Sequence, residues 1–252
     1  MGCRECGPSS FADLKAGCDW YERRPHYTDT LRRFRERIRT SAGLAGPNNK
    51  LDLSRLRHRV ELVDWLNQWG NMLPKTNREH RSRTLCGLGK WWQECSGRLL
   101  DVGLKDFGEL EAWRENVGDS RPRLRNHDLQ PAPVADLIDI YHELRSVELG
   151  AREFGPVAAS KTLFALRPEL FVAWDNPMMN AFGYRGGSPE RYALFLDDVR
   201  VILNNVERRC LPRDTALDAL PELLGERHSR CELPEIVNKY LFARAHGYVF
   251  TA

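Results

Sequence analysis

The sequence lacks any apolar run of the roughly 18 to 20 residues that a helix needs to cross a bilayer. The segment from Met1 to Cys6 also lacks the basic-then-apolar layout of a signal peptide. Both absences argue against a membrane or exported protein, and we expect a soluble protein in the cytoplasm. An excess of one charge is lacking too, because the formal net charge is only +3. The overall charge of the protein therefore gives no indication of a nucleic-acid partner.

The seven cysteines lack the even count and regular spacing of a disulfide scaffold, which favours reduced thiols. Cys3 and Cys6 form a Cys-x-x-Cys pair that Cys18 and His26 could extend into a zinc site. Structural zinc sites usually contain a second close pair, however, and this sequence has none. We therefore assign no metal and expect residues 1–27 to be loosely ordered, with a zinc site as the alternative.

Lysine is scarce, since only seven of the 38 basic residues are lysines and the other 31 are arginines. The guanidinium of arginine can donate two parallel hydrogen bonds to phosphate oxygens and can stack on bases, so the preference for arginine over lysine is compatible with DNA binding. A biased genome composition would give the same count. Local clusters are more informative, because they could follow a phosphate backbone. The clusters are Arg32, Arg33, Arg35, Arg37 and Arg39; Lys75, Arg78, His80, Arg81, Arg83 and Lys90; and Arg121, Arg123 and Arg125. Solvated helix faces are the alternative explanation.

The remaining composition is that of a globular protein, with 42% apolar and 29% charged residues. Apolar residues recur at helical spacing between Gly, Pro and Asn breaks, and almost no stretch alternates as a strand does. We predict an all-α fold, a compact bundle of roughly nine to eleven helices in one domain over residues 1–252, with two lobes and a cleft as a variant. Residues 41–50 and 119–133 are predicted breaks, and three glycines could interrupt the helix at 79–100. The predicted helices cover residues 28–40, 51–69, 79–100, 105–116, 134–149, 156–166, 177–182, 189–206 and 234–245.

The segment from Gly155 to Gly183 contains two predicted helix starts around a pair of charged residues. Lys161 lies in the second turn of the first helix. Asp175 is predicted to cap the second helix, where the N–H groups and the dipole favour a carboxylate. Such a carboxylate can stabilise a developing cation or activate water. Lys161 can act as a cation or, if its pKa is lowered by burial, as an amine nucleophile. A plain helix cap and a surface lysine are the alternatives.

The same segment resembles the helix-hairpin-helix DNA glycosylase superfamily. Members of that family carry a Gly-rich hairpin, a lysine at the start of a helix, an apolar stretch and an aspartate that caps the next helix. The matching pieces here are Ser160-Lys161-Thr162 and Phe171-Val172-Ala173-Trp174-Asp175. The two hairpin glycines fall on Val157 and Ala159, so the resemblance implies a degenerate hairpin.

By this resemblance, Asp175 is the carboxylate that supports the glycosyl cation, and Lys161 is the lysine that attacks the sugar in bifunctional members. The resemblance implies a DNA glycosylase that flips a modified base out of double-stranded DNA and cleaves its N-glycosidic bond, with or without AP-lyase activity. It implies neither a metal nor an organic cofactor, and we expect a monomer. Oxidised purines are the usual substrates of the family, and a bulky modified base in phage DNA is a second option.

A glycosylase holds the flipped base between apolar or aromatic walls. The candidates for contact with the base are Trp174, Trp92, Trp69 and Asn67. The candidates for contact with the DNA are Gly155, Ser160, Arg121, Arg123, Arg125 and Asn126. Core packing, helix capping and an exposed loop are the corresponding alternatives. The rival function is a non-catalytic helical module that binds nucleic acid or protein. A separation of Lys161 and Asp175 beyond roughly 10 Å, without a cleft, would reject the enzyme.

Overall fold

The computed structural model of the protein describes residues 6–40, 51–69, 78–102, 132–148 and 152–248. Within these ranges it contains ten α-helices, one 3₁₀-helix and no strand, so the predicted all-α fold is confirmed. None of the described helices combines the length and the apolar character needed to cross a membrane. The elements are α1 (Phe11–Glu22), α2 (Pro25–Thr40), α3 (Leu56–Gln68), α4 (Arg78–Asp101), α6 (Ala132–Arg145), α7 (Gly155–Leu166), α8 (Asn176–Ala181), α9 (Pro189–Cys210), η4 (Leu217–Ala219), α10 (Leu220–Leu224) and α11 (Leu233–Ala245).

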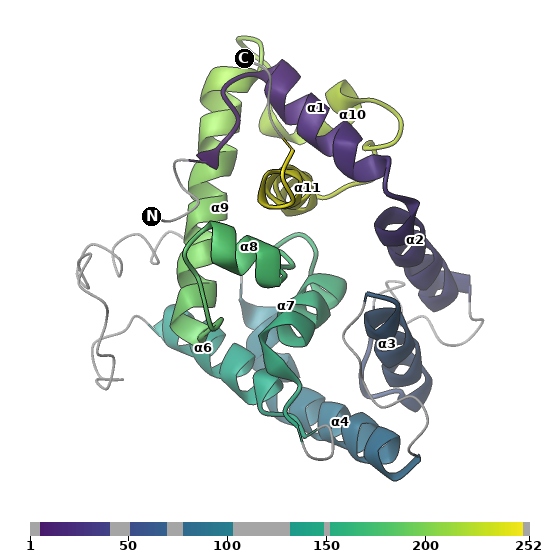
Figure 1. Cartoon of the computed structure of the whole chain (residues 1–252). Helices are drawn as coiled ribbons and strands as arrows, with labels where there is room; N and C mark the ends of the chain where they lie inside the picture. The colour runs from purple at the N-terminus through teal and green to yellow at the C-terminus, as the bar shows by residue number, and fades with distance from the viewer. Residues whose placement is uncertain (1–5, 41–50, 70–77, 103–131, 149–151, 249–252) are drawn as a thin grey trace.

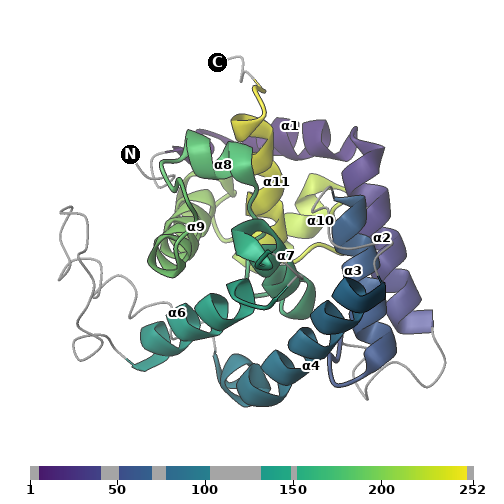
Figure 2. The same ribbon diagram turned by 60° about the horizontal axis from the view of Figure 1, so that its bottom comes forward.

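Helices α7 and α11 lie in the middle of the molecule, and the other helices surround them (Figure 1, Figure 2). Seven consecutive residues of α7, Ala158 to Phe164, are buried, and so are the ten residues of α11 from Pro234 to Ala243. A helix that is buried on every side is normally apolar all round. The polar residues that depart from this rule include two lysines, Lys161 on α7 and Lys239 on α11, each of which is only 4% exposed.

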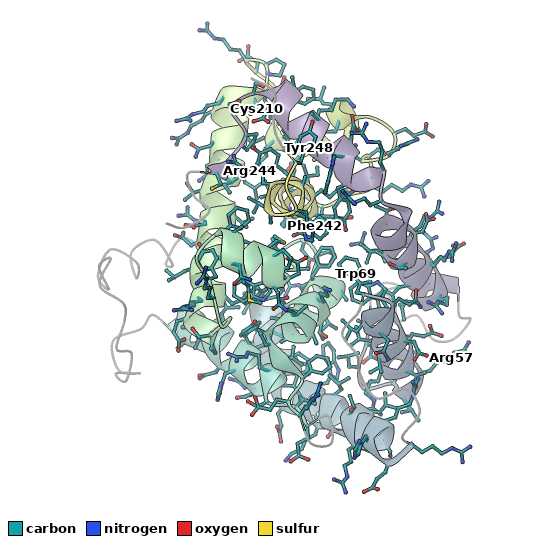
Figure 3. The ribbon with its side chains drawn as sticks, viewed as in Figure 1. Arg57, Trp69, Cys210, Phe242, Arg244 and Tyr248 are labelled. Atoms are coloured by element: carbon teal, nitrogen blue, oxygen red, sulfur yellow. The ribbon has the colours of Figure 1, made fainter. Side chains whose placement is uncertain are left out.

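The surrounding helices are amphipathic and turn one apolar face toward the centre. In α3, Leu62, Val63 and Leu66 are buried, whereas Arg57 points away from the molecule (Figure 3). The buried apolar side chains form one core cluster that extends from Leu14 in α1 to Phe242 in α11. One continuous core therefore holds both central helices in place.

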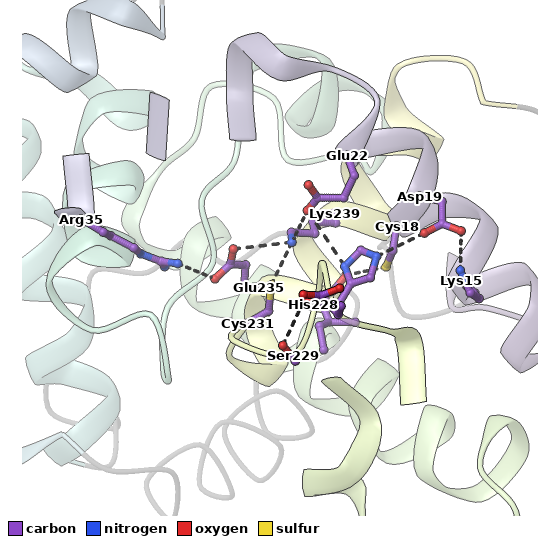
Figure 4. A network of polar contacts seen from close by, with 12 residues as sticks. Lys15, Cys18, Asp19, Glu22, Arg35, His228, Ser229, Cys231, Glu235 and Lys239 are labelled. Atoms are coloured by element: carbon purple, nitrogen blue, oxygen red, sulfur yellow. Dashed lines mark hydrogen bonds and ion pairs between the residues drawn. The ribbon is translucent and has the colours of Figure 1, made fainter. Parts of the chain in front are cut away.

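Helix α1 is joined to α11 by a buried polar network around Lys239 (Figure 4). The Nζ of Lys239 lies 2.5 Å from Oε1 of Glu22, 2.9 Å from Sγ of Cys231 and 3.7 Å from Oε1 of Glu235. Glu235 also forms an ion pair with Arg35 of α2 at 3.0 Å. Burial alone would lower the pKa of Lys239, but the surrounding negative groups, Glu235 first among them, outweigh it and raise that pKa. The charge of Lys239 is thus explained by its partners.

The N-terminal helix corrects the expectation of loose order over residues 1–27. Residues 11–22 form α1, in which Leu14 and Cys18 are fully buried. Ser10 caps this helix, because its side chain accepts the N–H of Asp13 at 3.2 Å. The capping residue is visible in the sequence, so the helix could have been predicted.

Helix α4 runs without interruption despite its three glycines. A Cβ added at Gly89 would lie 1.6 Å from the guanidinium of Arg59, and one at Gly87 would lie 2.9 Å from Val147. These two glycines therefore allow neighbouring elements to approach α4 closely. The helix predicted from residue 51 instead begins at Leu56, because the Asp52 carboxylate accepts the N–H of Ser54 and closes a turn. The predicted helix at 105–116 lies outside the described residues. So does the loop at 119–133, except for 132 and 133, which begin α6.

Candidate active site

A cavity of about 420 Å³ lies between the starts of α7 and α8 and one side of α11. Lys161 and Asp175 both line it, so the two predicted catalytic residues share one cavity. Its walls include two aromatic residues labelled in Figure 3, Trp69 just after α3 and Phe242 on α11, which lie near the middle of the molecule. Cavities of a few hundred cubic ångströms are typical binding sites for small molecules, and a nucleobase is within that size.

Lys161 presents a buried amine to this cavity. Its Nζ lies 4.5 Å from the centre of the Trp69 ring, a cation–π distance. Among the described residues, the ammonium has no hydrogen-bond or ion-pair partner. Burial lowers the pKa of Lys161 to about 8, while the negative charge of Asp175 acts in the opposite direction. At pH 7 roughly a tenth of this amine is therefore unprotonated and nucleophilic, a far larger share than for a lysine with the ordinary pKa.

Asp175 is held by both of its carboxylate oxygens. Oδ1 accepts the backbone N–H of Met178 at 2.8 Å, which makes Asp175 the N-cap of α8 as predicted. Oδ2 lies 2.8 Å from Nε2 of His246, which directly follows α11. The imidazole of His246 in turn stacks on Phe242, with ring centres 3.9 Å apart. The carboxylate thus has a fixed orientation at the cavity wall.

Glycines bring the starts of α7 and α8 together. Gly155 begins α7 and lines the cavity with a φ of +76°, a left-handed conformation that favours glycine. Gly187, with a φ of +54°, lies so close to the two helices that a Cβ there would be 2.6 Å from Pro156 and 2.8 Å from Met179. The turn before α9 therefore packs directly against both helix starts and fixes their relative position.

Ser160 and Trp174 take structural roles and not the predicted contacts with DNA and base. Ser160 is fully buried, and its hydroxyl accepts the backbone N–H of Trp174 at 3.2 Å, so it cannot reach a DNA backbone. Trp174 borders the cavity but is only 1% exposed. Its indole N–H donates to the carbonyl of Pro156, and its ring packs against Tyr192 and Phe195 at 5.0 and 5.3 Å. This ring belongs to the core and offers no open face for stacking.

The other predicted contact residues are dispersed. Trp69 lines the cavity, and its indole N–H donates to Thr30 at 2.8 Å. Asn67 is 7% exposed on α3 and Trp92 lies on α4 beside Trp91, and neither lines this cavity. The predicted DNA contacts of the long loop lie outside the described residues; these are Arg121, Arg123, Arg125 and Asn126.

No known protein family matches this chain, and neither a curated protein nor a solved structure is significantly similar to it. The chemistry of the cavity is therefore the basis for a functional assignment.

Three residues in or beside this cavity were not among the residues predicted from the sequence: His246, Asn238 and Phe242. His246 bonds to Asp175 across 71 positions of sequence, and no local pattern signals such a contact. Asn238 is 4% exposed, lines the cavity and has a buried Oδ1 with no hydrogen-bond partner among the described residues. This buried amide oxygen is available to accept a hydrogen bond from a molecule bound in the cavity. Asn238 and Phe242 lie one helical turn apart on α11, a spacing that the sequence shows and that places the two residues on one face of the helix.

The described residues contain no group of three or more His, Cys, Asp or Glu side chains arranged to hold a metal ion. The Cys18 thiol donates instead to the carbonyl of Ile236 at 3.6 Å, and burial raises the pKa of that thiol. Of the other proposed ligands, Cys6 is partly buried, whereas Cys3 and the side chain of His26 lie outside the described residues.

Proposed function

We propose that this protein is a DNA glycosylase that flips a modified base from double-stranded DNA and cleaves its N-glycosidic bond. One observation carries the proposal: a buried amine, Lys161, and an oriented carboxylate, Asp175, face one cavity large enough for a nucleobase. Paired groups with these properties suit cleavage of a glycosidic bond, in which positive charge develops on the sugar. The resemblance of the segment around them to the glycosylase superfamily supports the same chemistry.

In the proposed reaction, the bond between the base and C1′ of the sugar breaks and the base leaves with the bonding electrons. Asp175 stabilises the positive charge on the sugar, water or the neutral amine of Lys161 adds to C1′, and the proton that this nucleophile loses neutralises the departing base. Addition of Lys161 gives a Schiff base after ring opening, which is the route to AP-lyase activity. A pKa of about 8 for Lys161 supports this second route, because a protonated amine cannot attack.

The walls of the cavity suit a flipped base. The rings of Trp69 and Phe242 supply aromatic surface, and the unsatisfied amide of Asn238 can hydrogen-bond to a base edge. The substrates favoured by the resemblance are oxidised purines or a bulky modified base in phage DNA. The arginines of α2 and the start of α7 at Gly155 are the proposed DNA contacts among the described residues. Val157 and Ala159, the positions that correspond to the two hairpin glycines in the resemblance, lie near the start of α7. A cytoplasmic monomer is part of the same proposal.

The test is incubation of the protein with a panel of duplexes, each containing one oxidised, alkylated or glycosylated base, and with phage DNA rich in modified cytosines. Released base is measured by mass spectrometry, and abasic sites by alkaline cleavage. We expect release of at least one base, with a loss of roughly 100-fold or more in Asp175→Asn. Lys161→Ala should abolish any adduct trapped by borohydride.

The matched controls are Lys15→Ala, which changes a partly exposed residue of α1, and Asp101→Asn, which changes an exposed residue of α4. Both should behave like the wild type. Undiminished release in Asp175→Asn would overturn the mechanism. Tight binding of DNA with no release from any substrate would favour the non-catalytic binding module instead.

A further inference from the structure

Among the described residues, His246 supplies the side-chain hydrogen bond to the second oxygen of the Asp175 carboxylate, at 2.8 Å. We propose that His246 is a positioning residue that orients Asp175 and, through it, keeps the Lys161 amine available for reaction. Its effect on base release rests on the proposed function, whereas its effect on Lys161 can be measured without DNA.

The direction of the hydrogen bond follows from the chemistry of the two groups. An ionised carboxylate only accepts hydrogen bonds, so Nε2 of His246 carries the proton and donates it to Oδ2 of Asp175 at 2.8 Å. The other oxygen, Oδ1, accepts the N–H of Met178. With one donor on each oxygen, rotation of the carboxylate breaks at least one hydrogen bond. Asp175 is therefore held in one rotamer at the wall of the cavity that Lys161 also lines.

The ring of His246 is itself fixed. It stacks on Phe242 with the ring planes 18° apart, and the side chain is only 25% exposed. The backbone N–H of His246 donates to the carbonyl of Phe242 at 3.0 Å, which ends α11 independently of the side chain. Replacement of the imidazole therefore leaves the end of the helix in place.

The electrostatic consequence reaches Lys161. The titratable groups that line the cavity are Tyr21 from α1, Arg152 before α7, Lys161 and Asp175. Burial lowers the pKa of Lys161, and the charge of Asp175 partly opposes this effect. Because His246 draws the carboxylate charge toward its own N–H, it weakens that opposition. Loss of the imidazole should leave a stronger negative charge near Lys161 and favour its protonated form.

Two substitutions separate this role from a packing role. His246→Phe keeps the stacking on Phe242 but removes the donor, and His246→Gln keeps a donor but removes the stacking. The matched control is His142→Phe, which changes an exposed histidine of α6. Lys161 is the one lysine between Arg152 and Arg167, so a proteolytic peptide reports on it alone.

The first readout is the pH dependence of reductive methylation of Lys161 by formaldehyde and cyanoborohydride, followed by mass spectrometry on the full-length protein. His246→Phe should shift this titration upward by about one pH unit, and His246→Gln by much less. Asp175→Asn should shift it downward, and His246→Phe should have no further effect in the Asp175→Asn background. A wild-type titration in His246→Phe would overturn the proposal.

The second readout is single-turnover base release. His246→Phe should slow release roughly 10- to 100-fold at unchanged DNA affinity, and His246→Gln should restore most of it. If no DNA yields a free base but the Lys161 titration shifts as stated, the glycosylase assignment fails and the positioning role stands. If base is released but the titration and the release rate of His246→Phe match the wild type, the positioning role fails and the glycosylase stands.

Discussion

The ammonium of Lys161 lies 4.5 Å from the centre of the Trp69 ring, and the indole of Trp69 is itself anchored by a hydrogen bond from its N–H to Thr30. Trp69 has two opposing effects on the lysine. Its π face stabilises the charged form by roughly 1 kcal/mol, while its bulk excludes the water that would solvate that charge. For a buried lysine the exclusion of water shifts the pKa by up to about 3 units or more, so it is the larger effect.

Trp69→Ala should therefore raise the pKa of Lys161 from about 8 toward its ordinary value, because water enters the cavity. Trp69→Phe should shift it little. Methylation of Lys161 as a function of pH measures both variants. A lower pKa in Trp69→Ala would mean that the cation–π contact dominates.

Lys161 should also reduce the stability of the fold at neutral pH. Its pKa falls from 10.5 in the unfolded chain to about 8 in the folded protein, so the unfolded state binds its proton more tightly. The penalty is fully present below about pH 8 and fades as the pH rises to about 10.5. Lys161→Met should therefore stabilise the protein by up to roughly 3 kcal/mol at pH 7.

Urea unfolding of the wild type and Lys161→Met at pH 7 and pH 10 tests this point, with Lys90→Met as the surface control. The difference between wild type and Lys161→Met should shrink at the higher pH. Equal stability of the two proteins at pH 7 would show that the ammonium is not desolvated. A residue that lowers stability where no structural partner requires it is typical of a functional site.

The start of α8 could be predicted from sequence, because Asp175 and the proline two residues later form a local helix-start signal. The same holds for Lys161, whose place on α7 follows from helical spacing. The role of Trp174 could not be predicted, because its burial depends on Tyr192 and Phe195, which lie on another helix. Likewise, the local sequence around Gly89 predicts a break in the helix. The reason for a glycine there is the close approach of Arg59 from α3, which depends on tertiary packing and cannot be seen in the local sequence.

The capping and chemical roles of Asp175 can be separated by two substitutions. Asparagine caps a helix as well as aspartate does, whereas alanine removes the acceptor for the Met178 N–H. Asp175→Ala should cost about 1 kcal/mol of stability and Asp175→Asn much less, although both should lose base release. Thermal unfolding measures the stability of each variant. Equal destabilisation in both variants would show that the hydrogen bond to His246, not the cap, holds the site together.

The network around Lys239 should matter for stability alone. Lys239→Met removes the lysine partner of the buried Glu22 carboxylate and leaves Glu235 with Arg35 alone, at a cost of roughly 3 kcal/mol. Lys15→Met removes a partly exposed ion pair with Asp19 on the same helix α1 and should cost less than about 1 kcal/mol. Urea unfolding near neutral pH compares the two variants. An equally small effect of both would mean that the buried pair adds nothing to the α1–α11 contact.

The most direct test of the account is single-turnover base release by the wild type and by Asp175→Asn, on the best substrate of the panel and at matched DNA binding. The account predicts that the wild type releases the base and that Asp175→Asn, with its fold and its helix cap intact, is slower by roughly 100-fold or more. Equal rates for the two proteins would contradict the assignment of this cavity as the active site.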